Sequence, residues 1–139
     1  MLTLSIMPYT VLVIDDEESV RLYLETALTG AGYTVLAATS GSIAVQLCAQ
    51  FEGPIHLIIA DVVLRSISGP DVVKYALTMR PGTKALFISG HPREALIERG
   101  LSEEMPFLAK PFAFKELEGR IQELLRADCS GGRIAGTDK

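Results

Sequence analysis

Cysteine is scarce in this sequence. Only Cys48 and Cys129 occur among 139 residues, and they lie far apart without the spacing of a metal site. Their number and placement argue against a disulfide framework and against a cysteine-ligated metal centre. We expect two chemically idle thiols in a reducing, cytoplasmic setting.

Long apolar runs and clustered basic residues are also absent. No stretch of about 18 apolar residues occurs, and the first ten residues lack a basic segment, so we expect neither a membrane span nor a signal peptide. Lysine and arginine together number 13 against 17 acidic residues, and they are scattered along the chain. Because no basic stripe is present to neutralise a phosphate backbone, we expect no direct nucleic-acid binding by this chain.

The sequence does have enough apolar residues for one folded domain. Hydrophobic residues make up 48% of the chain and charged residues 22%, which is ordinary for a globular protein. A length of 139 residues fits a single core. The end of the chain is polar, contains glycine and lacks periodicity. We therefore expect an N-terminal extension at 1–8, one domain at 9–127, and a flexible tail or truncated linker at 128–139.

Within that domain, short apolar runs alternate with amphipathic segments. Val20, Leu24 and Leu28 recur every fourth residue, as one buried face of a helix requires. The run 55–60 is nearly all apolar, which is typical of a strand covered on both faces of a parallel sheet. The expected strands are 10–15, 33–38, 55–60, 84–89 and 106–109. The expected helical segments are 17–31, 41–51, one starting at Gly69 and Pro70, 92–101, and one carrying Leu117, Ile121, Leu124 and Leu125.

This alternation predicts an α/β fold. Strands separated by helices form a parallel sheet with right-handed crossovers, so we expect a doubly wound open sheet with helices on both faces. In such folds ligands bind outside the carboxyl ends of the strands. The functional residues should therefore lie at that edge.

Polar residues follow the expected strands at that edge. Asp15 and Asp16 come at the end of the first strand, Asp61 after the third, Ser89 at the end of the fourth, and Lys110 after the fifth. Each residue alone could be a helix cap or a turn residue. Together, three carboxylates, a hydroxyl and an ammonium at the ends of four strands indicate a site.

The chemistry of this set points to phosphoryl transfer. Clustered carboxylates repel one another unless a cation neutralises them, and hard oxygen ligands suit Mg²⁺. Lys110 and Ser89 could hold phosphoryl oxygens while Asp61 acts as the nucleophile. The product would be an acyl phosphate, which water can cleave, so the modified state would be temporary.

These residues make the chain resemble the receiver domain of bacterial two-component response regulators over residues from about 9 to 127. The resemblance implies a flavodoxin-like (βα)5 fold with strand order 2-1-3-4-5. It also implies a metal bound by Asp15, Asp16, Asp61 and the main-chain carbonyl of Val63. Asp61 then resembles the phosphoacceptor, assisted by Lys110 and the switch hydroxyl of Ser89.

Further positions match the same family pattern. Phe107 resembles the aromatic whose rotamer accompanies the movement of the hydroxyl, although a core phenylalanine explains it equally well. The Lys110–Pro111 pair resembles a lysine–proline pair whose peptide bond is typically cis, and Gly69 falls at the position of the family's loop glycine. Arg65 departs from the pattern, because the family often has proline there, and this departure puts the rigidity of the loop in doubt.

Neither histidine is expected to take part in the chemistry of the site. His91, between Ser89 and the next helical segment, flanks the phosphoryl site in related domains, but we expect an exposed loop residue. His56 lies in the apolar third-strand run, where burial disfavours charge, so we expect a neutral, hydrogen-bonded ring.

The resemblance implies a signalling phosphoacceptor rather than a conventional enzyme. Its partners would be a histidine kinase or histidine phosphotransfer domain and a downstream protein or output domain. A homodimer would use the face formed by the helical segment 92–101, the strand 106–109 and the last helix. The stretch after the fourth strand also resembles receivers of hybrid histidine kinases.

Two other classes remain as alternatives. A magnesium-dependent phosphohydrolase would usually carry a second acid two residues after its nucleophile, where this chain has Val63. A degenerate receiver acting as a scaffold would lack one of Asp61, Ser89 or Lys110, and this chain has all three.

Overall fold

The computed structural model describes residues 9–134, and side chains through residue 126. The expected N-terminal extension at 1–8 and the last five residues lie outside the described residues. Five strands alternate with helical segments. In chain order these are β1 (Thr10–Ile14), α1 (Glu18–Gly30), β2 (Thr34–Ala38), α2 (Gly41–Gln50), β3 (Leu57–Asp61), α3 (Gly69–Met79), β4 (Lys84–Ser89), the 3₁₀ helix η2 (Arg93–Arg99), β5 (Phe107–Ala109) and α4 (Phe114–Ile134).

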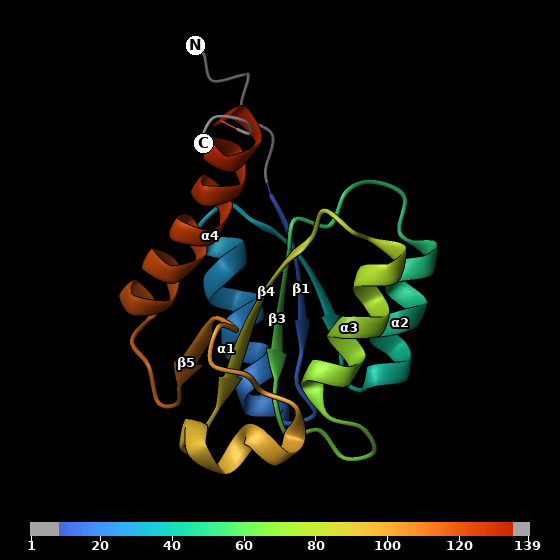
Figure 1. Ribbon diagram of the computed structural model, residues 1–139. Coiled ribbons are helices and arrows are strands. Elements are labelled where there is room, and N and C mark those ends of the chain that lie inside the picture. The colour runs from blue at the N-terminus through green and yellow to red at the C-terminus, as the bar shows by residue number, and fades with distance from the viewer. Residues whose placement is uncertain (1–8, 135–139) are drawn as a thin grey trace.

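The strands form one parallel sheet in the order β2-β1-β3-β4-β5. Helices α1 and α4 cover one face, and α2 and α3 cover the other (Figure 1). All residues of β1 and β3 are buried, as strands between two helical layers require. The predicted doubly wound fold and its strand order are confirmed, and the strand bounds differ from those expected by at most two residues.

The sheet divides the core into two apolar clusters. On the α1 and α4 side, Leu24, Leu28, Leu117 and Ile121 are fully buried against the strands. The other cluster packs α2 and α3 against the opposite face of the same strands. Because β1 and β3 are fixed from both sides, the residues at their carboxyl ends have rigid supports.

The fourth helical segment is not an α-helix, unlike the helical segments between the other strands. Over Arg93–Arg99 it is a 3₁₀ helix, with Ala95 N–H donating to Pro92 O and Gly100 N–H donating to Ile97 O. Gly100 ends it with a left-handed φ of 97°. This conformation favours glycine, which has no β-carbon to clash. At seven residues the segment is longer than most 3₁₀ helices.

The last helix is longer than the sequence indicated. α4 continues to Ile134, so residues 128–134 are helical, in contrast to the flexible tail expected from 128. No proline follows Pro111, and extending an existing helix costs far less than nucleating one. None of the helices in the described part of the chain is long and apolar enough to cross a membrane.

Gly69 is the first residue of α3, and it has no room for a side chain. A β-carbon there would overlap the main-chain carbonyl of Asp61, and the Gly69 N–H donates to Val62 O at 2.8 Å. The start of α3 is therefore packed directly on the end of β3. Ser68 caps this helix by accepting the N–H of Asp71. Pro70 lies in the first turn of the helix, as the sequence predicted.

We expect Gly69→Ala to lower the free energy of unfolding by about 1–3 kcal/mol, because either the start of α3 or the Asp61 backbone must shift. Urea denaturation checks this. Gly82→Ala is the matched control, since a β-carbon at Gly82 meets no atom within 4 Å. Equal stability of the two variants would contradict the close approach.

Candidate functional site

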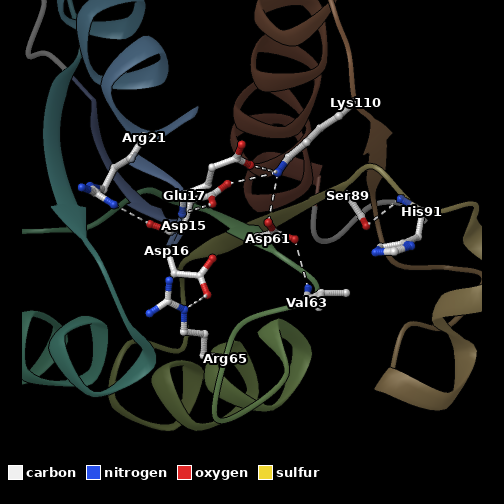
Figure 2. Close-up of polar contacts among 10 residues, drawn as sticks. All are labelled: Asp15, Asp16, Glu17, Arg21, Asp61, Val63, Arg65, Ser89, His91 and Lys110. Atoms are coloured by element: carbon white, nitrogen blue, oxygen red, sulfur yellow. Dashed lines mark hydrogen bonds and ion pairs between the residues drawn. The ribbon is translucent and has the colours of Figure 1, made fainter. Parts of the chain in front are cut away.

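The residues expected at the strand ends do converge at one edge of the sheet. Asp15 and Asp16 directly follow β1, Asp61 is the last residue of β3, Ser89 is the last residue of β4, and Lys110 directly follows β5. Figure 2 shows the side chains of Asp15, Asp61 and Lys110 pointing toward one another. The parallel topology produces this meeting, because neighbouring strands end at the same edge.

Lys110 is the basic centre of the cluster. Its Nζ lies 3.0 Å from Asp61 Oδ2, 3.3 Å from Asp15 Oδ2 and 3.9 Å from Glu17 Oε1. Burial alone would lower the pKa of this ammonium. The hydrogen bond and charge of Asp61, and then those of Asp15, outweigh burial and raise the Lys110 pKa above its ordinary value. Lys110 is therefore held as a cation between two carboxylates.

Two of the carboxylates are also oriented by the main chain. Asp15 Oδ1 accepts the N–H of Glu17 at 2.9 Å, and Asp61 Oδ1 accepts the N–H of Val63 at 3.0 Å. Each contact is local, from a side chain to the backbone two residues on. Each carboxylate therefore has one oxygen on a backbone donor and the other on Lys110.

The acidic cluster fits a divalent cation. Asp15, Asp16 and Asp61 each offer a carboxylate oxygen, and these oxygens lie within 4.8 Å of one another. Asp15 is fully buried, and burial, with the negative charge of Asp61, raises its pKa above 3.8 against the opposing effects of the Glu17 N–H and Lys110. A hard cation would relieve this unfavourable charge, and carboxylate oxygens are ligands that Mg²⁺ prefers.

We expect Asp15→Asn to stabilise the fold at neutral pH. Because the pKa of Asp15 is raised in the folded state, the stability linked to its proton is present below pH 3.8 and is lost as pH rises through the folded-state pKa. The charged group then costs stability, whereas Asn keeps an oxygen for the Glu17 N–H. We expect a gain of about 1 kcal/mol, which is within the usual range for a stabilising substitution.

Urea denaturation over a pH series without divalent cations tests this expectation. The difference between Asp15→Asn and the wild type should shrink as pH falls toward the ordinary pKa of the carboxyl. Adding Mg²⁺ should stabilise the wild type more than the variant. Asp71→Asn, at an exposed acid of α3, is the control and should change little. A less stable Asp15→Asn variant at neutral pH would contradict the expectation.

Ser89 is buried at the cluster's edge, with an exposed fraction of 1%. Its Oγ accepts the N–H of His91 at 3.0 Å, while His91 itself is exposed (Figure 2). Phe107, at the start of β5, is half-buried beneath the guanidinium of Arg93, whose Cζ lies 5.1 Å from the ring centroid. The peptide bond Lys110–Pro111, expected to be cis, is cis.

His56 lies just before β3 and is half-buried. Its Nδ1 accepts the N–H of Thr10 at 2.9 Å, and its ring meets that of Tyr9 edge to face at 4.9 Å. The hydrogen bond expected for this ring is therefore present. His56 therefore serves the amino-terminal edge of the sheet, away from the carboxylates.

Sequence reasoning missed several contacts of the site. Glu17 faces Lys110, and the only signal was its place directly after the acidic pair. Arg21 donates from Nη1 to the main-chain oxygen of Asp15 at 2.9 Å. Arg65 reaches Asp16, and Arg93 reaches Phe107. Long side chains of this kind can point in many directions, so their partners follow from the folded geometry.

Known proteins provide comparisons for this arrangement. The family model described as "Response regulator receiver domain" matches residues 11–122. The sensor kinase CckA of Brucella abortus is 32% identical over 117 residues, which are 84% of this chain and 12% of that protein. The transcriptional regulatory protein CusR of Escherichia coli is 33% identical over 119 residues, 83% of this chain and 50% of that protein.

Solved structures agree with these sequence comparisons. The crystal structure of the receiver domain from the hybrid histidine kinase CckA superimposes with a TM-score of 0.71 at 31% identity. The match covers 84% of this chain and 98% of that one. This chain thus spans half or less of the two full-length relatives but almost all of an isolated domain.

Proposed function

Since the chain belongs to the response regulator receiver domain family of two-component systems, we propose that it accepts a phosphoryl group on Asp61 in the presence of Mg²⁺. One observation carries the proposal: Lys110 Nζ lies between Asp61 and Asp15, at 3.0 and 3.3 Å from their oxygens, at the edge where the β-strands end. A receiver domain is a signalling module.

In the proposed reaction a carboxylate oxygen of Asp61 attacks the phosphorus of the donor. A new P–O bond forms to Asp61 as the donor's bond to phosphorus breaks, and the donor leaves with that electron pair. Lys110 stabilises the negative charge of the phosphoryl oxygens, and the Ser89 hydroxyl offers a further hydrogen bond. Later attack by water releases inorganic phosphate and restores the carboxylate.

The proposed metal ligands are Asp15, Asp16, Asp61 and the main-chain carbonyl of Val63. Mg²⁺ bound there would neutralise phosphoryl charge during transfer. Val63, as an apolar residue, supplies no second acid for a leaving group, so the receiver reaction is favoured over phosphohydrolase chemistry. We infer that the chain promotes its own phosphorylation and dephosphorylation without acting on separate substrates as a conventional enzyme does.

The proposed signal passes through Ser89. A phosphoryl group on Asp61 would draw the Ser89 hydroxyl away from the His91 N–H and toward the phosphoryl oxygens. Phe107 would change rotamer in the same transition and repack the face formed by η2, β5 and α4. That face is where we propose that a downstream protein, an output domain or a second copy of the chain binds.

The proposed phosphodonor is a histidine kinase or a histidine phosphotransfer domain in the cytoplasm. The similarity to the sensor kinase CckA supports a second proposal, that this chain is the receiver portion of a hybrid histidine kinase. Nothing in its charge pattern favours direct nucleic-acid binding.

Incubation with Mg²⁺ and acetyl phosphate, followed by intact-mass measurement, tests the proposed function. We expect one phosphate adduct per chain, formed only with a divalent cation and lost slowly in buffer. No adduct with the wild type would favour a scaffold. Rapid turnover of added phosphate esters would favour a hydrolase.

A further inference from the structure

Arg65 approaches the acidic cluster from a side that Lys110 does not reach. It lies four residues after Asp61, in the loop between β3 and α3, and its Nε is 3.7 Å from Asp16 Oδ2. The Arg65 side chain is 87% exposed, whereas that of Asp16 is only 23% exposed. An external basic side chain thus covers a largely sheltered carboxylate.

The two basic side chains divide the carboxylates between them. Lys110 pairs with Asp15, Asp61 and Glu17, and Arg65 pairs with Asp16. Figure 2 shows Lys110 and Arg65 on opposite sides of the cluster. All three carboxylates that could hold a metal therefore have a basic partner within the chain.

We propose that Arg65 is the internal counter-ion of Asp16 and that a divalent cation must displace it to bind. This inference rests on the proposed metal site. The guanidinium lowers the affinity of the site for the metal, because it repels the incoming cation and occupies the carboxylate that would bind it. Its exposure keeps the effect modest, since an exposed ion pair is weak.

The position of Arg65 links the displacement of its guanidinium by the metal to the loop after β3. Val63, whose carbonyl is a proposed ligand, is two residues before Arg65, and the loop ends at Gly69 against the Asp61 backbone. Metal binding would therefore free Arg65 from Asp16 while engaging the carbonyl of Val63, two residues earlier in the same loop. Arg65 thus acts as a positioning residue that sets the metal concentration needed for phosphorylation.

Measurement of Mn²⁺ binding tests the proposal. Mn²⁺ is a paramagnetic substitute for Mg²⁺, and the electron paramagnetic resonance spectrum of the free ion reports how much of it is unbound. We expect Arg65→Gln to bind Mn²⁺ about two- to five-fold more tightly, equivalent to about 0.4–1 kcal/mol. Arg126→Gln changes the net charge equally at an exposed residue of α4 and should leave the Kd unchanged. Equal Kd values for Arg65→Gln and the wild type, or equal tightening by both variants, would overturn it.

A double-variant cycle shows whether the effect passes through Asp16. In an Asp16→Asn background, Arg65→Gln should no longer tighten Mn²⁺ binding, because the pair is already broken. Tightening of the same size in that background would overturn the proposal. Failure of every variant, wild type included, to bind Mn²⁺ would instead overturn the proposed metal site and this inference with it.

Discussion

We expect the Asp61→Asn variant to form no phosphate adduct when it is incubated with Mg²⁺ and acetyl phosphate. The carboxamide lacks the negative charge and the nucleophilic oxygen that attack on phosphorus requires. It keeps the shape of the carboxyl and an oxygen for the Val63 N–H, so the fold should survive. Intact-mass measurement after a fixed time, with circular dichroism to verify folding, checks this.

Asp71→Asn is the matched control for that experiment. It carries the same chemical change at an exposed residue in the first turn of α3, outside the cluster. This variant should accept phosphate as the wild type does. An adduct of undiminished yield in Asp61→Asn would mean that another residue is the acceptor, and the proposed function would fail.

Much of the fold could be predicted because its determinants are local. The four-residue spacing of Val20, Leu24 and Leu28 gives α1 one buried face, and the apolar run of β3 suits a strand covered on both sides. The polar residues at the strand ends needed only the parallel topology to be brought together. Their expected meeting at one edge therefore followed from chain order.

The features that could not be predicted depend on small energy differences or on long side chains. A 3₁₀ helix and an α-helix over Arg93–Arg99 share nearly the same sequence signals. The end of α4 at Ile134 depends on helix propagation past the glycines at 131 and 132, where a break is expected. The contact of Arg65 with Asp16 joins residues from two different loops, and neither sequence neighbourhood reveals it.

The charges that the site needs for function destabilise the fold, and Lys110 partly compensates for this. A buried, charged Asp15 beside Asp61 is unfavourable for folding, yet the same charges are what a divalent cation needs. Lys110 offsets part of this cost when no metal is bound. It would also contact the phosphoryl group, so one side chain is expected to serve both stability and reaction.

Lys110→Met should therefore reduce both the rate of phosphorylation and the stability of the fold. We expect the rate of adduct formation to fall by about 10²-fold or more, since a cation at the developing charge is lost. The free energy of unfolding should fall by about 1–3 kcal/mol at neutral pH, because buried Asp15 keeps its charge without its partner, with some screening by solvent. Lys115→Met, at an exposed lysine of α4, is the control for both measurements.

The pH dependence of this loss has a definite sign. The Lys110 pKa is raised in the folded state, so while its carboxylate partners stay charged its contribution is present below its ordinary pKa of 10.5 and is lost as pH rises through the folded-state value. At acidic pH, Asp15 takes up a proton and no longer needs a cation. The stability gap between Lys110→Met and the wild type should therefore narrow as pH falls, and urea denaturation at neutral and acidic pH measures it.

The double variant Asp15→Asn with Lys110→Met separates the two roles of Lys110. Removing both charges leaves no unpaired buried carboxylate at position 15, but Asp61 still lacks Lys110, so part of the lost stability should return. Adduct formation should stay at least as slow as in Lys110→Met, because the cation for the phosphoryl oxygens is still missing. Recovery of phosphorylation together with stability would show that Lys110 acts only through the fold, and its proposed part in the reaction would fail.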